Sequence, residues 1–252
     1  MESVTAEDLA VFQERGVLRV PGAFPRDLAN QVADTLWDDL SKRRGVKRAD
    51  PSTWGTAPWG GFRGVAPLLD QIGTPRLTAA LSVVLGSDEW RFGKRMGAIL
   101  AGPPVGHAAA WRPTARTWHF DGGLGESGVM FFALFARLEP HEGGTMLLEG
   151  SHHLVEHFHS EIRAEDRSLS HSELQARLID RYDLLHELTR REPLDPTQPS
   201  FLEGRPWQTT RLRVVDVCGE PGDVLVCKLN LLHAPPTYVG PQPRFFMKGN
   251  VV

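Results

Sequence analysis

The chain has 252 residues, of which 41% are hydrophobic, a share that allows a sizeable buried core. Its formal net charge is −3, and the 28 lysines and arginines are spread along the chain, so the basic stripe of a nucleic-acid-binding protein is missing. No apolar run reaches the length of a membrane-spanning helix, and the first residues are acidic where a secretory signal is basic. We therefore expect a cytoplasmic protein with neither nucleic-acid nor membrane partners.

The cysteine content excludes a disulfide-rich scaffold. Cys218 and Cys227 are the two cysteines, and both lie in or beside apolar, strand-like runs. Cysteines in such surroundings are usually buried thiols. We expect both to be free and buried.

Helices dominate the predicted structure of residues 1–87. They are expected at 5–14, 25–43 and 74–85, with one short strand at 17–20. The second helix carries the clearest signal, because apolar side chains recur every four positions along it. Thr5 is a typical amino-terminal cap for the first helix, and Gly86 is a typical stop for the third. A loop rich in Gly, Pro and Trp is expected at about 44–64.

Short apolar runs separated by Gly and Pro turns fill the rest of the chain. Strands are expected at 90–100, 115–121, 129–138, 144–148, 209–217, 223–229 and 244–251. This pattern is typical of a sandwich or barrel. Residues 153–192 interrupt it, because they are polar and helix-forming, and predict a helical insertion. We expect one domain over 1–252, with N-terminal helices (about 1–87) packed on a β-core (about 88–252).

A His-Xaa-Asp sequence provides the first candidate metal ligands. Residues two apart in an extended chain point to the same face, so His119 and Asp121 can reach one ion while Phe120 points away. An imidazole with a carboxylate suits Fe(II) better than a sulfur-rich set does. Because so short a pattern also arises by chance, a third ligand is required.

The third candidate ligand is His233, at the far end of an apolar, strand-like run. The prolines of 234–243 exclude a continued central strand. If these residues form a hairpin loop centred near Tyr238 and Val239, Arg244 lies opposite His233 on the neighbouring strand. A guanidinium at such a place can bind a carboxylate through two hydrogen bonds.

Two histidines and one aspartate make up the facial triad of non-haem Fe(II) oxygenases, which leaves three octahedral positions open. Two open positions suit a chelating 2-oxo acid, and the third suits O₂. Arg244 would then hold the remote carboxylate of the 2-oxo acid.

The chain resembles the phytanoyl-CoA dioxygenase-like family of Fe(II)/2-oxoglutarate-dependent oxygenases. The resemblance is carried by FQERGVLRVPGAFPRDLANQVADTL at 12–36, GGTMLLEGSHH at 143–153 and GDVLVCKLNLLHAPPTYVGPQPRFFM at 222–247. It implies a mainly β fold with flanking helices around a double-stranded β-helix (jelly-roll, cupin-like) core. It also implies His119, Asp121 and His233 as iron ligands, and Arg244 as the anchor of 2-oxoglutarate.

The same resemblance suggests further site residues. The first core strand lines the co-substrate pocket in this family, which makes Lys94 a candidate contact of 2-oxoglutarate. His152 matches a residue that supports the site or the fold, and it is also a candidate contact of the substrate. Related halogenases lack the carboxylate ligand, so Asp121 indicates hydroxylation or another oxidation rather than halogenation.

Two loops beside the expected site supply candidate contacts of the substrate. These candidates are Trp59, Arg63, Trp111 and Arg112. Long loops rich in Gly and Pro next to a site often act as lids. By contrast, the histidines of the insertion are expected on the solvated surface, namely His157, His159, His171 and His186.

The sequence therefore predicts an enzyme that uses Fe(II), 2-oxoglutarate and O₂, with ascorbate as a stimulant. It is expected to hydroxylate or otherwise oxidise a C–H bond of a small molecule, a metabolite or natural-product intermediate, with release of succinate and CO₂. Two alternatives stay open: a cupin-like metalloenzyme that does not use 2-oxoglutarate, and a non-catalytic jelly-roll binding protein. Arg244 argues against the first, and the complete ligand set argues against the second. Nothing in the sequence specifies an oligomeric state.

Overall fold

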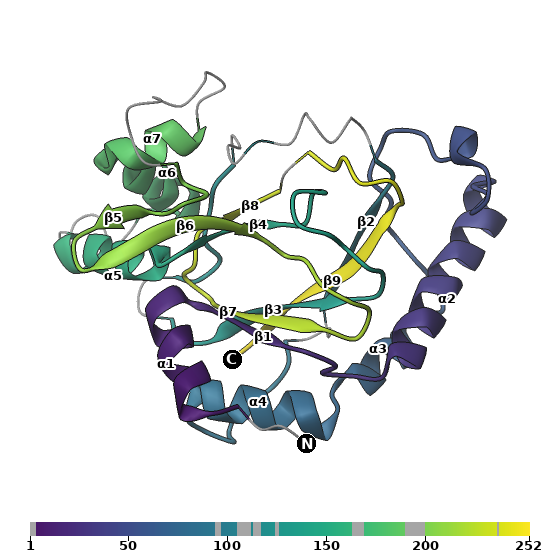
Figure 1. Cartoon of the computed structure of the whole chain (residues 1–252), viewed down its shortest axis with the longest axis horizontal. Helices are drawn as coiled ribbons and strands as arrows, with labels where there is room; N and C mark the ends of the chain where they lie inside the picture. Colours follow the sequence, from purple (N-terminus) through teal and green to yellow (C-terminus); the bar gives the residue numbers. More distant parts are fainter. Residues whose placement is uncertain are drawn as a thin grey trace.

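Two antiparallel sheets form the core of the computed structural model, which describes residues 4–93, 97–104, 112, 117–123, 126–162, 169–189, 200–235 and 237–252 (Figure 1). The five-stranded sheet has the order β1 (Val17–Val20), β7 (Val224–Lys228), β3 (Val129–Leu134), β9 (Arg244–Val251), β2 (Ala98–Gly102). The four-stranded sheet has the order β5 (Arg205–Trp207), β6 (Thr210–Asp216), β4 (Met146–Glu149), β8 (His233–Ala234). The chain crosses repeatedly between the two sheets, as in a jelly-roll. The predicted mainly β fold with flanking helices is confirmed.

Alternation along the strands sorts the apolar side chains into three layers. In β3, Phe131 joins the core beneath the N-terminal helices, whereas Phe132 joins the core between the sheets. In β4, Leu147 faces that same inter-sheet core, and Leu148 faces the inserted helices. Because successive residues of a strand point to opposite faces, each sheet is apolar on both sides and is covered on both.

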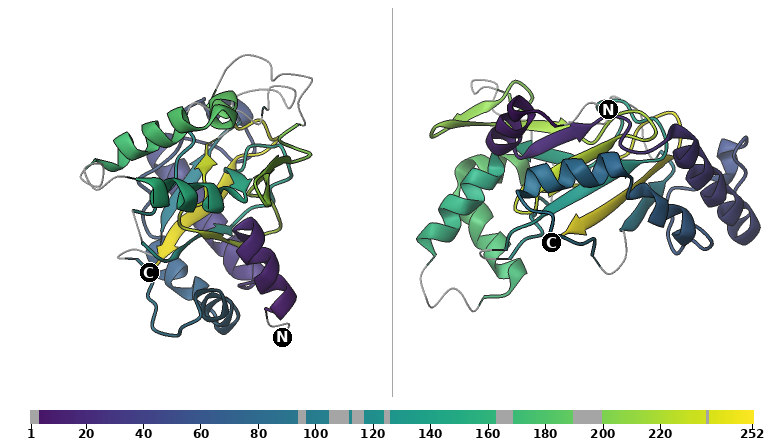
Figure 2. Two further views of the ribbon diagram at one scale, coloured as in Figure 1. Left: turned by 90° about the vertical axis from the view of Figure 1, so that its left-hand side faces the viewer. Right: turned by 90° about the horizontal axis from the view of Figure 1, so that it is seen from below.

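The N-terminal helices cover the outer face of the five-stranded sheet. They are α1 (Ala6–Arg15), α2 (Arg26–Arg44) and α4 (Pro75–Leu85), close to the predicted bounds, and α4 crosses this face in Figure 2. Thr5 caps α1 in a reciprocal capping box with Asp8, and Gly86 ends α4 in the left-handed conformation. Three short helices were not predicted: η1 (Pro51–Thr53), α3 (Ala66–Leu69) and η2 (Asp70–Ile72).

The predicted insertion is helical and covers the outer face of the four-stranded sheet. It contains α5 (Ser151–Glu161), α6 (His171–Arg181) and α7 (Asp183–Thr189), and so begins slightly before residue 153. Leu178, Leu185 and Leu188 are fully buried against the sheet. Burial of this apolar stripe is the main reason that a polar, charged segment stays attached to the core.

Some strands differ from their predicted bounds. In the described part of the strand expected at 90–100, regular pairing begins at Ala98 and continues to Gly102, while Phe92 forms an isolated bridge with Val251. In the described part of the strand expected at 115–121, the pairing is a single bridge at His119. β3 ends at Leu134 because the chain bends after it.

The hairpin expected between His233 and Arg244 is wrong. β8 pairs with β4 in the four-stranded sheet, whereas β9 pairs with β3 and β2 in the five-stranded sheet. Arg244 therefore lies opposite Gly102. The connection 235–243 crosses from one sheet to the other, and its prolines lack the N–H groups that a regular hairpin ladder requires.

Two expectations from composition can be compared with the structure. Cys218 and Cys227 are free, as predicted; Cys227 is buried and Cys218 is half-buried. No helix among the described residues is both long and apolar enough to cross a membrane. That the whole chain forms one domain stays a prediction.

Asp223 ties the start of β7 to the turn that follows β1. Its carboxylate accepts the backbone N–H of Gly22 at 2.9 Å and of Glu220 at 3.0 Å, and it pairs with Arg19 at 2.5 Å. Burial raises the pKa of Asp223, but these hydrogen bonds and the charge of Arg19 lower it further, so the net pKa is below its ordinary value.

Replacement of Asp223 by asparagine is predicted to destabilise the protein by about 2 kcal/mol at pH 7, because charge-assisted hydrogen bonds are lost. A carboxyl with a depressed pKa stabilises the fold above its unfolded pKa and stops doing so as the pH falls through its folded pKa. Urea unfolding at pH 7 and near pH 3 measures both effects, and the difference between wild type and D223N should shrink at the lower pH. An equal difference at both values would contradict this account.

Candidate metal centre

Three side chains of metal-binding types converge between the two sheets. One ligand atom from each of His119, Asp121 and His233 lies within 4.8 Å of the other two. His233 is buried, and the other two residues are half-buried. The structure thus brings together the three residues that the sequence singled out.

Strand pairing brings the two histidines together. The N–H of His119 donates to the carbonyl of His233 at 2.9 Å, and the N–H of His233 donates back at 2.8 Å. His233 also lies opposite Leu147, whose side chain belongs to the inter-sheet core. Because paired residues place their side chains on one face, both imidazoles point into the space between the sheets, and Asp121, two residues from His119, does the same.

Each imidazole is oriented by the carbonyl two residues before it. Nδ1 of His119 lies 2.8 Å from the oxygen of Thr117, and Nδ1 of His233 lies 3.0 Å from the oxygen of Leu231. When Nδ1 donates its proton to a carbonyl, Nε2 keeps the lone pair that binds a metal. Burial, together with the charges of Lys248 and His119, lowers the pKa of His233 to about 3, so its ring is neutral at physiological pH.

Lys248 is a fourth polar side chain at the centre, and the sequence reasoning missed it. Its Nζ lies 2.7 Å from Oδ2 of Asp121 and 2.8 Å from Nε2 of His233. Burial raises the pKa of Asp121, but the hydrogen bond from Lys248 and the nearby charges outweigh it and lower the pKa overall. The ammonium group is therefore a counter-ion of the Asp121 carboxylate.

The alternation of β9 is the sequence signal that would have identified Lys248. Phe246 belongs to the inter-sheet core, whereas Phe245 and Met247 belong to the core under the N-terminal helices. Arg244 and Lys248 therefore share the inward face with Phe246. Counting in steps of two from Arg244 leads directly to Lys248.

Arg244 faces inward, but it reaches the inter-sheet space from the end of its strand. Its Nη1 donates to the carbonyl of Gly143, and its guanidinium carbon lies 5.2 Å from the ring centroid of Tyr238 and 5.7 Å from that of Phe246. Within the described residues its buried Nε has no hydrogen-bond partner and its guanidinium forms no ion pair. A buried guanidinium of this kind is suited to an anionic ligand.

Four further residues were predicted to contact the co-substrate or the substrate. Lys94 and Trp111 lie outside the described residues. Arg63 and Arg112 are exposed. Their predicted contacts with co-substrate or substrate stay predictions.

Trp59 and His152 have packing partners of their own. The Trp59 ring lies 5.7 Å from Trp37 and 6.0 Å from Phe245, in the core under the N-terminal helices. His152 is buried, and its Nε2 lies 2.9 Å from the oxygen of Gln13, which ties α5 to α1. Burial lowers the pKa of His152 to about 4. Both side chains thus support the fold.

The sequence predicted that the histidines of the insertion would lie on the solvated surface, but two of them contact Phe120. His171 is exposed, yet its Nε2 lies 2.7 Å from the oxygen of Phe120. His159 is half-buried, and its ring centroid lies 5.6 Å from that of Phe120. The expectation missed these contacts because the inserted helices pack against the segment around Phe120, which sequence periodicity does not reveal.

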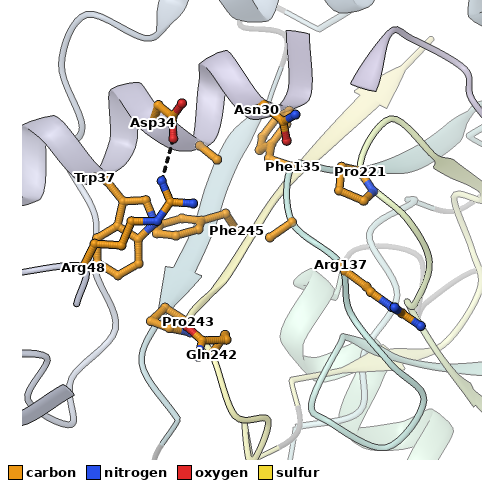
Figure 3. A pocket seen from close by; sticks show the side chains of 12 residues that line it. Asn30, Asp34, Trp37, Arg48, Phe135, Arg137, Pro221, Gln242, Pro243 and Phe245 are labelled. Atoms are coloured by element: carbon orange, nitrogen blue, oxygen red, sulfur yellow. Dashed lines mark hydrogen bonds and ion pairs between the residues drawn. The ribbon is translucent and has the colours of Figure 1, made fainter. Parts of the chain in front are cut away.

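A cavity of about 560 Å³ lies elsewhere, between α2 and the start of β9. Trp37 and Phe245 contribute to its apolar wall, and Arg48 pairs with Asp34 at 2.7 Å beside it (Figure 3). Phe245 points outward from β9 and Arg244 points inward. The five-stranded sheet therefore separates this cavity from the triad.

The triad fits a divalent transition metal. The ammonium of Lys248 already lies between Asp121 and His233, so this position attracts a cation. Two imidazoles and one carboxylate are a donor set typical of iron, and such a set leaves ligand positions open.

Comparisons with known proteins support the fold. No family model and no curated protein matches the sequence. Solved structures do match: SnoK, a non-haem α-ketoglutarate-dependent carbocyclase from nogalamycin biosynthesis, is 14% identical with a TM-score of 0.59, over 98% of this chain and 83% of SnoK. The chain has the fold of this enzyme. At such low identity the likeness extends to the fold alone.

Two further solved structures contain bound ligands. The epimerase SnoN, in complex with Fe³⁺, α-ketoglutarate and nogalamycin RO, is 14% identical with a TM-score of 0.55, over 98% of this chain and 82% of SnoN. HygX from Streptomyces hygroscopicus, with nickel and 2-oxoglutarate bound, is 15% identical with a TM-score of 0.53, over 99% of this chain and 87% of HygX. The same fold therefore holds a metal and a 2-oxo acid in those proteins.

Replacement of Lys248 by methionine is predicted to tighten the binding of Mn(II) about tenfold, a change of about 1.4 kcal/mol. The reason is that a metal ion no longer has to displace the internal counter-ion of Asp121. Calorimetric titration of the metal-free protein measures the change. Lys42→Met, which removes an exposed charge on α2, should leave the affinity unchanged. Weaker Mn(II) binding by K248M would show that the lysine supports the metal instead.

Proposed function

We propose that this protein is an Fe(II)- and 2-oxoglutarate-dependent enzyme that oxidises a small organic molecule. One observation carries the proposal. The triad of His119, Asp121 and His233 occupies the same inter-sheet space as the guanidinium of Arg244, whose Nε has no hydrogen-bond partner among the described residues. A metal site and an anion site are thereby combined in one compartment.

The charges of this compartment favour a dicarboxylate together with the metal. Asp121 contributes one negative charge, and Lys248 and Arg244 contribute one positive charge each. A divalent cation alone would add two further positive charges in a partly desolvated space, which is costly. A dicarboxylate such as 2-oxoglutarate restores the original balance, and Arg244 offers a bidentate partner for its remote carboxylate.

The chain's own residues orient and protect the reacting groups. The Nδ1 hydrogen bonds of His119 and His233 fix both rings with Nε2 toward the centre. The apolar side chains of Phe132 and Phe246 line the inter-sheet core and limit the access of water. When iron and 2-oxoglutarate are bound, they supply the activation of O₂, and the protein contributes geometry and a dry pocket.

The reaction that we propose is hydroxylation or another oxidation at a C–H bond, with release of succinate and CO₂. The carboxylate of Asp121 supports this over halogenation, because halogenases with related sites lack that ligand. The substrate that we propose is a metabolite or natural-product intermediate, in line with the natural-product enzymes that share the fold. The phytanoyl-CoA dioxygenase-like family is the proposed membership, on the sequence resemblance given above.

Replacement of His119 by alanine is predicted to weaken Fe(II) binding at least 100-fold, because one of three protein ligands is removed. Its ring is half-buried, so the metal-free protein should lose no more than about 1 kcal/mol of unfolding free energy. Anaerobic titration with Fe(II) and thermal unfolding measure the two quantities. Unchanged iron affinity in H119A would exclude this residue as a ligand.

Replacement of Arg244 by methionine is predicted to weaken 2-oxoglutarate binding about 100-fold while leaving Fe(II) affinity within threefold of wild type. The methionine keeps contact with Tyr238 and Phe246 but removes the charge and the donors. Anaerobic titration of the Fe(II) protein with 2-oxoglutarate, followed by the weak visible charge-transfer band, gives the affinity.

The matched control for this experiment is Arg137→Met, which removes an exposed arginine that pairs with Glu139 and Glu220. It should bind 2-oxoglutarate as the wild type does. If wild type binds Fe(II) but shows no band with 2-oxoglutarate, the protein is a metalloenzyme of another kind and the proposal fails.

A further inference from the structure

The segment that carries His119 and Asp121 lies at the edge of the four-stranded sheet. Its strand-like pairing is the bridge from His119 to His233 of β8, and the N–H of Asp121 donates to the oxygen of Leu229 at 3.2 Å. On the opposite side, the carbonyl of Phe120 accepts no backbone hydrogen bond from the described residues. An edge segment held from one side only is free to twist, and twisting here would separate the two ligands.

Helix α6 of the insertion supplies the missing partners. Nε2 of His171 lies 2.7 Å from the oxygen of Phe120, and the side-chain amide of Gln175 donates to the same oxygen at 3.0 Å. The two side chains are four residues apart and therefore project from one face of the helix. One carbonyl, located between two metal ligands, is thus held by two donors.

The side chains on the outer face of this segment are anchored in the same helices. Phe120 is fully buried, and its ring centroid lies 5.0 Å from that of His171. Trp118 is also buried, and its Nε1 donates to the oxygen of Leu188 in α7 at 3.2 Å. Residues 118 and 120 thus bind the insertion, while 119 and 121 project toward the metal centre.

We propose that His171 and Gln175 are positioning residues of the metal centre, which fix the peptide between His119 and Asp121 so that both side chains meet one ion. This inference rests on the proposed metal site. It gives the insertion a specific role, because α6 then contributes to metal affinity without touching the metal. Residues that orient metal ligands typically change affinity or activity by 10–100-fold when they are replaced.

The test uses variants that remove the donors and keep the packing. His171→Phe keeps a ring against Phe120 without an N–H, and Gln175→Glu keeps the size of the side chain but exchanges the donor for an acceptor. The probe is Co(II), whose affinity is measured by calorimetry and whose visible d–d spectrum reports ligand geometry. The double variant should bind Co(II) at least tenfold more weakly than wild type, with an altered spectrum.

Two further variants separate positioning from general stability. His171→Gln, which can still donate to the carbonyl, should bind Co(II) within threefold of wild type. His186→Phe, on α7 and paired with Asp180 rather than with Phe120, should behave as wild type. If the double variant does not fold, Gln175→Met removes one of the two donors alone and should weaken Co(II) binding about fivefold, outside the range expected of His171→Gln.

The outcomes distinguish this inference from the function on which it rests. If wild type binds Co(II) and the donor-free variants bind it equally well with an unchanged spectrum, the positioning role is wrong and the metal site stands. If H171Q loses affinity as strongly as the double variant, the ring rather than its N–H matters, which also overturns the inference. If wild type binds no Co(II), the metal centre fails and the positioning role fails with it.

Discussion

The site depends on one antiparallel bridge, in which the peptide groups of His119 and His233 exchange both of their hydrogen bonds. The bridge joins segments that are far apart in sequence, and it fixes which face each side chain takes. Leu147, opposite His233, sets that face toward the inter-sheet core. Two imidazoles are therefore held side by side, with ring centroids 4.1 Å apart, before any metal is considered. A shift of this pairing by one residue would turn the His119 ring to the opposite face from the His233 ring.

The two sheets contribute different parts of the site. The four-stranded sheet and its edge segment supply the three candidate ligands, and β9 of the five-stranded sheet supplies Lys248 and Arg244 from the opposite wall. The candidate ligands and the two cationic side chains therefore meet only because the sheets pack face to face. The apolar layers that hold the sheets together also make the compartment poorly hydrated, which strengthens each charge interaction within it.

Local signals in the sequence were sufficient for the longer helices and for the candidate ligands. The cap at Thr5 and the four-residue apolar period of α2 are properties of neighbouring residues, and the structure has both. His119 and Asp121 could be paired because alternation in an extended chain needs no knowledge of the sheet. His233 could be added because its residue type and its place at a strand end are visible in the sequence.

Features that depend on which sheet a strand joins could not be predicted in this way. The hairpin from His233 to Arg244 assumed that consecutive strands pair, whereas a jelly-roll sends them to different sheets. Lys248 meets Asp121 only across the gap between the sheets, and His171 meets Phe120 only through the packing of α6. Alternation along the last strand could have placed Lys248 on the inward face, but its contact with Asp121, like that of His171 with Phe120, is set by tertiary packing.

The most direct test of the metal centre is anomalous diffraction at the iron edge from crystals grown anaerobically with Fe(II) and 2-oxoglutarate. The account predicts one strong peak within about 2.0–2.2 Å of Nε2 of His119, Nε2 of His233 and a carboxylate oxygen of Asp121, in the range usual for such ligands. The Lys248 ammonium should then have left its position between Asp121 and His233. Absence of a peak there, with Lys248 still bridging the two ligands, would contradict the account.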